Sequence, residues 1–124
     1  MITVYGFSKL VGCRSEADEQ ADFVCWLEAK MIPHFAIPSE GERTKKFGAR
    51  LKRQGWRAGT PDLIIVARAP TDGCPVAVEM KRSKGGKVTK IQMAMHEVMT
   101  RNGWHIIVAH GCDLAIKEMN ALGF

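Results

Sequence analysis

The chain has 124 residues, of which 46% are hydrophobic and 25% charged, as in an ordinary globular protein, and we expect one domain over residues 1–124. Its 18 Lys and Arg residues outnumber its 13 Asp and Glu residues, and the formal net charge of +5 mildly favours polyanionic partners. No signal peptide and no apolar run of membrane-spanning length is visible, so we expect a cytoplasmic protein with no membrane partner.

The chain begins with a stretch that predicts little and then a clear helix. Residues 1–14 fit a short edge strand or an ordered arm. Ser15 is a suitable N-cap for an amphipathic helix over residues 16–31. The predicted inner stripe of this helix consists of Ala17, Ala21, Val24, Leu27 and Met31.

Beyond this helix the chain alternates between short apolar segments and helical ones. Strands are predicted over residues 34–37, 63–67, 76–81 and 105–109, and further helices over residues 45–54, 89–102 and 112–122. The segment 63–67 is a continuous apolar run, which predicts a strand covered on both faces. In the helix over residues 89–102 the residues predicted to point inward are Ile91, Ala94, Met95 and Val98. The order of elements predicts an α/β fold of three layers, with a mixed central sheet flanked by helices.

Two of the predicted strands each carry an acid at one end. Asp62 precedes one strand, and Glu79 lies in the next strand, followed two residues later by Lys81. Because side chains alternate along a strand, Glu79 and Lys81 point to the same face. If the two strands are neighbours, Asp62 lies beside Glu79. Their carboxylates, with the carbonyl of Met80, would suit a hard divalent cation such as Mg²⁺.

A lysine beside such an ion could orient or deprotonate an attacking water, but each residue also has an ordinary interpretation. Asp62 fits an acid that precedes a strand, and Glu79 with Lys81 fits a surface ion pair. Gln92 follows Thr89 at the spacing of a capping box, so it fits a helix cap as well as a hydrogen bond to a site water or substrate.

Two basic runs flank this stretch. Residues 43–57 contain seven Lys or Arg residues and no acid, and residues 81–90 contain another five and no acid. Such clusters suit the phosphate backbone of nucleic acid, although any single cation also fits a solvated surface. The candidate DNA-binding residues are Arg43, Lys45, Lys46, Arg50, Lys52, Arg53, Arg57, Arg82, Lys84 and Lys87.

Cysteine and histidine spacing predicts no zinc site. The four cysteines, at positions 13, 25, 74 and 112, form no C-x-x-C pair and show no clustering with histidine along the chain. We expect reduced thiols.

Three strings taken together resemble one known family. They are G-T-P-D (residues 59–62), V-E-M-K-R (residues 78–82) and G-G-K-V-T-K-I-Q (residues 85–92). This combination is similar to the VRR-NUC domain, the virus-type replication-repair branch of the PD-(D/E)xK nuclease superfamily. The resemblance covers nearly the whole chain and is to the small stand-alone form found in phages and prophages.

The resemblance implies a restriction-endonuclease-like core and a DNA endonuclease that depends on Mg²⁺, with Mn²⁺ also supporting activity. It implies that Asp62 and Glu79 bind the metal, that Lys81 is the catalytic lysine and that Gln92 is the glutamine of the site. It also implies a glutamate on the first helix.

Glu16 matches the position of that glutamate, with Glu19 as the alternative; either also fits an acid favoured by the positive end of a helix. One departure concerns the loop after the first strand, where relatives often carry a Pro-Asn-Gly-Gly-like turn. This chain has P-S-E-G-E-R at residues 38–43, which leaves a substrate role of Arg43 open.

Small relatives of this form are similar to Holliday-junction resolvases that act as homodimers in DNA repair and leave a 5′-phosphate and a 3′-hydroxyl. The resemblance therefore implies a branched DNA substrate, in the cytoplasm of a bacterial host if the protein is phage-encoded. Two alternatives stay open: a non-catalytic DNA-binding subunit, and a nuclease for flap, linear or RNA ends.

Overall fold

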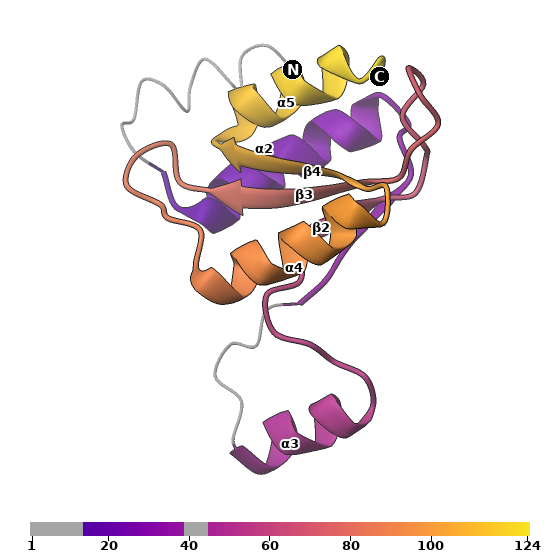
Figure 1. Ribbon diagram of the computed structural model, residues 1–124. Helices are drawn as coiled ribbons and strands as arrows, with labels where there is room; N and C mark the ends of the chain where they lie inside the picture. The colour runs from indigo at the N-terminus through magenta and orange to yellow at the C-terminus, as the bar shows by residue number, and fades with distance from the viewer. Residues whose placement is uncertain (1–13, 39–44) are drawn as a thin grey trace.

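The structure of the protein is a computed structural model that describes residues 14–38 and 45–124 (Figure 1). Arg43, its loop and the arm before Arg14 lie outside the described residues. The elements are α2 (Glu16–Ala29), β1 (His34–Ala36), α3 (Lys45–Arg53), β2 (Leu63–Ile65), β3 (Val76–Lys81), α4 (Lys90–Arg101), β4 (His105–His110) and α5 (Cys112–Ala121). Their order is the one that the sequence predicts.

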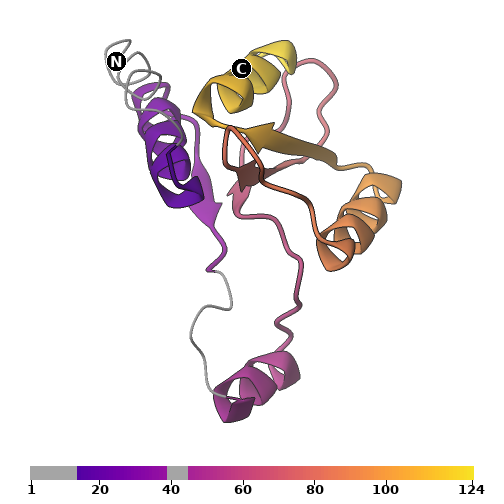
Figure 2. The same ribbon diagram turned by 90° about the vertical axis from the view of Figure 1, so that its left-hand side faces the viewer.

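The four strands form one mixed sheet in the order β1-β2-β3-β4. The pairs β1/β2 and β2/β3 are antiparallel, whereas β3 and β4 run parallel, with α4 as the connection between them. Helices α2 and α5 pack together on one face of the sheet and α4 lies on the other (Figures 1 and 2). The predicted three-layer α/β fold is therefore confirmed.

The inner face of α2 differs from the predicted stripe. Ala17 and Ala21 are exposed, and the side chain of Met31 is 87% exposed. The buried residues of α2 are Glu19, Asp22, Phe23, Trp26 and Leu27. The prediction is confirmed for Leu27 and for Val24, which packs against the core. It was wrong for the other three residues because two acids occupy the inner face, where each finds a polar partner outside the helix.

Two further burial predictions were wrong. The strand β2 ends at Ile65, and Val66 is 56% exposed, so the apolar run is not covered along its length. On α4, Ile91 is 59% and Val98 46% exposed, and no residue of the helix is fully buried. The reason is that α4 packs chiefly on β4, the edge strand of the sheet, which covers only a narrow strip of the helix.

The basic helix α3 stands apart from the layered body (Figures 1 and 2). Residues 54–62 lead from it to β2 and pass close to α4. At Gly59, which has a φ of +82°, an added Cβ would lie 2.7 Å from the carbonyl oxygen of Ile91. This close approach fixes the chain just before Asp62. Within the described ranges, the structure has no helix long and apolar enough to cross a membrane.

Candidate active site

The strand pairing brings Asp62 and Glu79 together. In the antiparallel β2/β3 pair Leu63 lies opposite Val78, so the next opposed pair is Asp62 and Glu79. The two carboxyl groups are hydrogen-bonded to each other. An oxygen of Asp62 (Oδ2) also accepts a hydrogen bond of 2.7 Å from the backbone N–H of Met80. The two acids are 17 residues apart in sequence, and the fold makes them neighbours in one layer.

Glu79 is an enclosed acid, with 1% of its surface exposed. Burial, followed by the hydrogen bond that protonated Glu79 donates to Asp62 and by the charge of the Asp62 carboxylate, raises the pKa of Glu79 to about 9. The positive charge of Lys81 acts in the opposite direction, and the charge of Glu16 adds to the increase. At neutral pH Glu79 therefore keeps its proton, and a divalent cation could replace that proton between the two acids.

Lys81 is also buried, at 5% exposure, and its Nζ donates a hydrogen bond of 3.0 Å to Oε1 of Gln92. The same oxygen accepts from the backbone N–H of Thr89 at 2.9 Å, and the hydroxyl of Thr89 accepts from the N–H of Gln92. The capping-box interpretation of Gln92 is confirmed, whereas its hydrogen bond to a site water or substrate stays a prediction. The capping box fixes the first turn of α4, and the amide oxygen holds the lysine beside the acids.

His96 lies in the same cluster, although nothing in its local sequence marks it as a site residue. Its Nε2 is 3.3 Å from Oε1 of Glu79. Burial, and then the charge of Lys81, lower the pKa of His96, while that of Glu79 is raised, so their contact is a hydrogen bond between neutral groups at neutral pH. The sequence feature that could have identified His96 is its position four residues after Gln92, which places both side chains on the same face of α4.

The two glutamates of the first helix have different surroundings. Glu19 is buried, and its Oε1 accepts a hydrogen bond of 3.1 Å from the backbone N–H of Cys112, the first residue of α5. It therefore caps α5, whose preceding residue, Gly111, has no side chain to do so. Glu16 is exposed on the first turn of α2, where its charge reaches Glu79.

The candidate DNA-binding residues fall into two described groups on the surface. The group on or next to α3 is exposed and consists of Arg50, Lys52, Arg53 and Arg57. The group on the loop after β3 is also exposed and consists of Arg82, Lys84 and Lys87. Lys45 and Lys46 form the first turn of α3.

The donor atoms suit a hard cation. Two carboxylates lie side by side at the site, and the backbone of Met80 adjoins Asp62. Oxygen donors of this kind, completed by water and phosphate, are what Mg²⁺ prefers. The two buried, adjacent carboxyl groups therefore fit such an ion.

The fold and the site together define the class of protein: a three-layer α/β domain with two paired acids and a buried lysine at the carboxyl end of β3. The family model described as VRR-NUC domain matches residues 13–113. The chain belongs to this family of nuclease domains. A solved structure described as a VRR_NUC domain protein is 22% identical, with a TM-score of 0.75, and the match covers 89% of this chain and 88% of that one. It shows the shared fold. Among curated proteins no match is found.

Proposed function

We propose that the protein is a Mg²⁺-dependent, structure-selective DNA endonuclease that resolves four-way junctions, with Mn²⁺ as an alternative cation. The observation that carries the proposal is the adjacency of the Asp62 and Glu79 carboxyl groups, with Lys81 held on the same face of β3. The proposal extends the family membership to the chemistry of the PD-(D/E)xK nucleases.

In this proposal Asp62, Glu79 and the carbonyl of Met80 would hold the cation. When bound, the cation supplies Lewis acidity that lowers the pKa of a nearby water and offsets charge on the scissile phosphate. Lys81, fixed by Gln92, orients the attacking water and balances negative charge as it develops. The water oxygen bonds to phosphorus, the bond from phosphorus to the 3′ oxygen breaks, and one water proton ends on that oxygen. The products are a 5′-phosphate and a 3′-hydroxyl.

The surface around the acids supports DNA as the substrate. An open depression of about 200 Å³ adjoins Asp62 between the segment after α3 and the start of α4. Its lining includes Trp56, Gly59, Thr60, Ile91 and Gln92. The exposed cations of α3 precede its lining segment in the chain, and those of the loop after Lys81 follow the site directly in the chain. A DNA backbone bound to both groups would pass the acids.

A branched substrate and a homodimer belong together in this proposal. A two-fold dimer carries two equivalent sites, which suits symmetrical cleavage of opposing strands at a four-way junction. We expect sedimentation to show a dimer at the concentrations used for cleavage.

The test compares end-labelled four-way junction, flap, linear duplex and single-stranded RNA in Mg²⁺, Mn²⁺ and EDTA. We expect cleavage of the junction to be fastest and to require a divalent cation. Asp62→Asn and Lys81→Ala should each slow it by about 10²–10⁴-fold. Glu118→Gln and Lys117→Ala, exposed on α5, are the matched controls and should cleave normally.

Each alternative has its own signature. Junction binding without cleavage of any substrate in Mg²⁺ or Mn²⁺ would identify a non-catalytic DNA-binding subunit. Faster cleavage of flap, linear or RNA ends than of the junction would replace the resolvase assignment. Normal cleavage by Asp62→Asn would overturn the catalytic site itself.

A further inference from the structure

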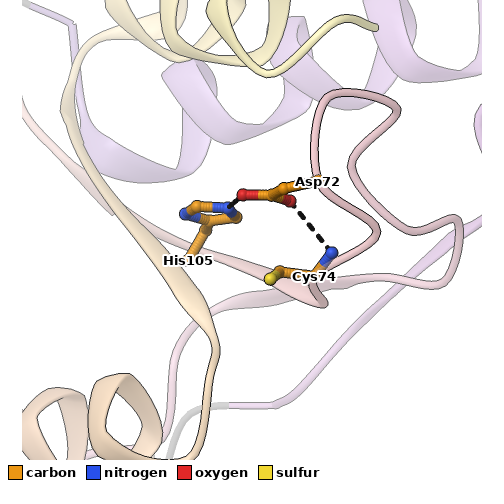
Figure 3. Close-up of side chains that lie close together, drawn as sticks. All are labelled: Asp72, Cys74 and His105. Atoms are coloured by element: carbon orange, nitrogen blue, oxygen red, sulfur yellow. Dashed lines mark hydrogen bonds and ion pairs between the residues drawn. The ribbon is translucent and has the colours of Figure 1, made fainter.

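A second cluster of metal-ligating side chains lies at the other end of the sheet. It consists of Asp72 and Cys74, from the loop between β2 and β3, and His105, the first residue of β4 (Figure 3). One ligand atom from each residue lies within 4.8 Å of the other two. Since β3 and β4 are parallel and His105 pairs with Val76, this cluster adjoins their amino ends, whereas Glu79 and Lys81 lie toward their carboxyl ends.

The loop is held in place by its own backbone. The N–H of Gly73 donates to the carbonyl of Ala69 at 2.7 Å, and the N–H of Ala69 donates to the carbonyl of Cys74 at 2.9 Å. The N–H of His105 donates to the carbonyl of Pro75 at 2.8 Å, which ties the loop to β4. The backbone that carries the three side chains is therefore positioned before any ligand arrives, which lowers the entropic cost of binding.

Hydrogen bonds among the three side chains centre on Asp72. Its Oδ2 lies 2.6 Å from Nε2 of His105, and its Oδ1 accepts from the backbone N–H of Cys74 at 3.0 Å (Figure 3). The carboxylate thus lies between the imidazole and the residue that carries the thiol. A cysteine nucleophile would need the imidazole next to its sulfur, and here the imidazole contacts the acid instead. The ordinary role of an acid in a turn explains Asp72. It does not explain why the thiol of Cys74 and the imidazole of His105 lie beside it.

We propose that Asp72, Cys74 and His105 bind a transition-metal ion of the Zn²⁺ class, with water as the fourth ligand. One thiolate, one imidazole nitrogen and one carboxylate oxygen are all ligands that zinc accepts, and tetrahedral zinc spaces such atoms about 3–4 Å apart. Binding releases the thiol proton to solvent and replaces the hydrogen bond between His105 and Asp72 with bonds to the ion.

The site is open to solvent, which gives the ion an entry path: the side chain of Asp72 is 43% and that of His105 34% exposed. It also differs chemically from the paired acids, because sulfur and nitrogen ligands select zinc or cobalt over Mg²⁺. The bound ion would link the loop to β4 and so stabilise the folded sheet, independently of nuclease activity.

The test uses Co²⁺ as a spectroscopic substitute for Zn²⁺. It is titrated into the full chain carrying Asp62→Asn and Glu79→Gln, which removes the paired acids as competing ligands. We expect a near-ultraviolet thiolate-to-cobalt charge-transfer band that saturates at one ion per chain and is lost when Zn²⁺ is added. Zn²⁺ should also raise the midpoint of thermal unfolding.

Ligand variants decide the assignment. Cys74→Ser should abolish the charge-transfer band, whereas Cys25→Ser, at an exposed free cysteine on α2, should leave it intact. His105→Gln keeps the sulfur and should weaken cobalt binding by more than about tenfold while retaining the band at saturation. Absence of the band in the parent protein, or its survival in Cys74→Ser, would overturn the proposal. Circular dichroism of each variant verifies that it is folded.

Discussion

Glu79 connects stability with pH, because it is a buried acid hydrogen-bonded to a second acid. In the unfolded chain its carboxyl ionises near the ordinary value of 4.5, whereas the folded protein keeps the proton up to a pKa of about 9. Between these values the folded state binds more protons than the unfolded state, so the contribution of Glu79 to stability falls as pH rises. Above pH 9 both states are ionised and the contribution is constant.

Replacement of Glu79 by glutamine should therefore stabilise the metal-free protein at neutral and alkaline pH. The amide cannot ionise, so Glu79→Gln should exceed the wild type in free energy of unfolding by about 1–2 kcal/mol at pH 8, with the difference vanishing near pH 4. Urea denaturation in EDTA across this range measures it.

Glu118→Gln, on the exposed face of α5, is the control and should follow the wild-type profile. Added Mg²⁺ should reduce the difference in free energy of unfolding between Glu79→Gln and the wild type, because it should stabilise the wild type alone. A difference that does not change with pH would show that Glu79 is not protonated in the folded state.

At the scale of single residues, the sequence identifies the acids of the site better than it identifies the residues that lie beside them in the fold. Asp62 and Glu79 stand out because charges next to apolar strands are rare, and the strand register then follows from the alternation of side chains. His96 carries no such mark, since a histidine on a polar helix face is common. The cluster of Asp72, Cys74 and His105 was missed because Asp72 and His105 are 33 residues apart and meet only through the sheet.

At the level of elements, helix α2 shows why a hydrophobic stripe can mislead. Its inner face includes Glu19 and Asp22, which an apolar pattern assigns to the outside. Glu19 accepts from the backbone of Cys112, and Asp22 pairs with Arg14. Buried acids are tolerated when they are paired, but the partner of Glu19, 93 residues away, cannot be inferred from local spacing.

The segment from α3 to β2 gives a sharper test of packing. Gly59 has a positive φ, and a side chain there would meet the backbone of Ile91 at 2.7 Å, where neither partner can rotate away. Gly59→Ala should lower the free energy of unfolding by about 2–3 kcal/mol, through both strained backbone and overlap. Thermal or urea unfolding measures the loss.

Gly103→Ala is the matched control, because Gly103 also has a positive φ of +88° but open space around its missing Cβ. Gly103→Ala should lower the free energy of unfolding by only about 1 kcal/mol, because it adds backbone strain without steric overlap. Equal losses for the two variants would show that the segment does not pack on α4 as described.

For the whole molecule, the order of elements follows from the sequence, but the placement of α3 does not. Its pattern predicts a basic helix, but it does not predict that the helix lies away from the three layers (Figure 1). A helix with a dense cationic face and little packing is suited to a polyanion, as the proposed function requires. Arg50 and Arg53 line an open depression on it, together with Gln54.

The arginines of α3 therefore provide a test of DNA binding that is separate from catalysis. Arg50→Ala with Arg53→Ala, made in the inactive Asp62→Asn background, should weaken junction binding and reduce the slope of log K against log salt by about 2. Fluorescence anisotropy at several salt concentrations measures both quantities. Lys117→Ala with Arg101→Ala removes the same charge from exposed positions on α5 and α4 and should change the slope less. If the two double variants lose equal affinity and slope, net charge rather than α3 attracts the DNA, and α3 is not part of the binding surface.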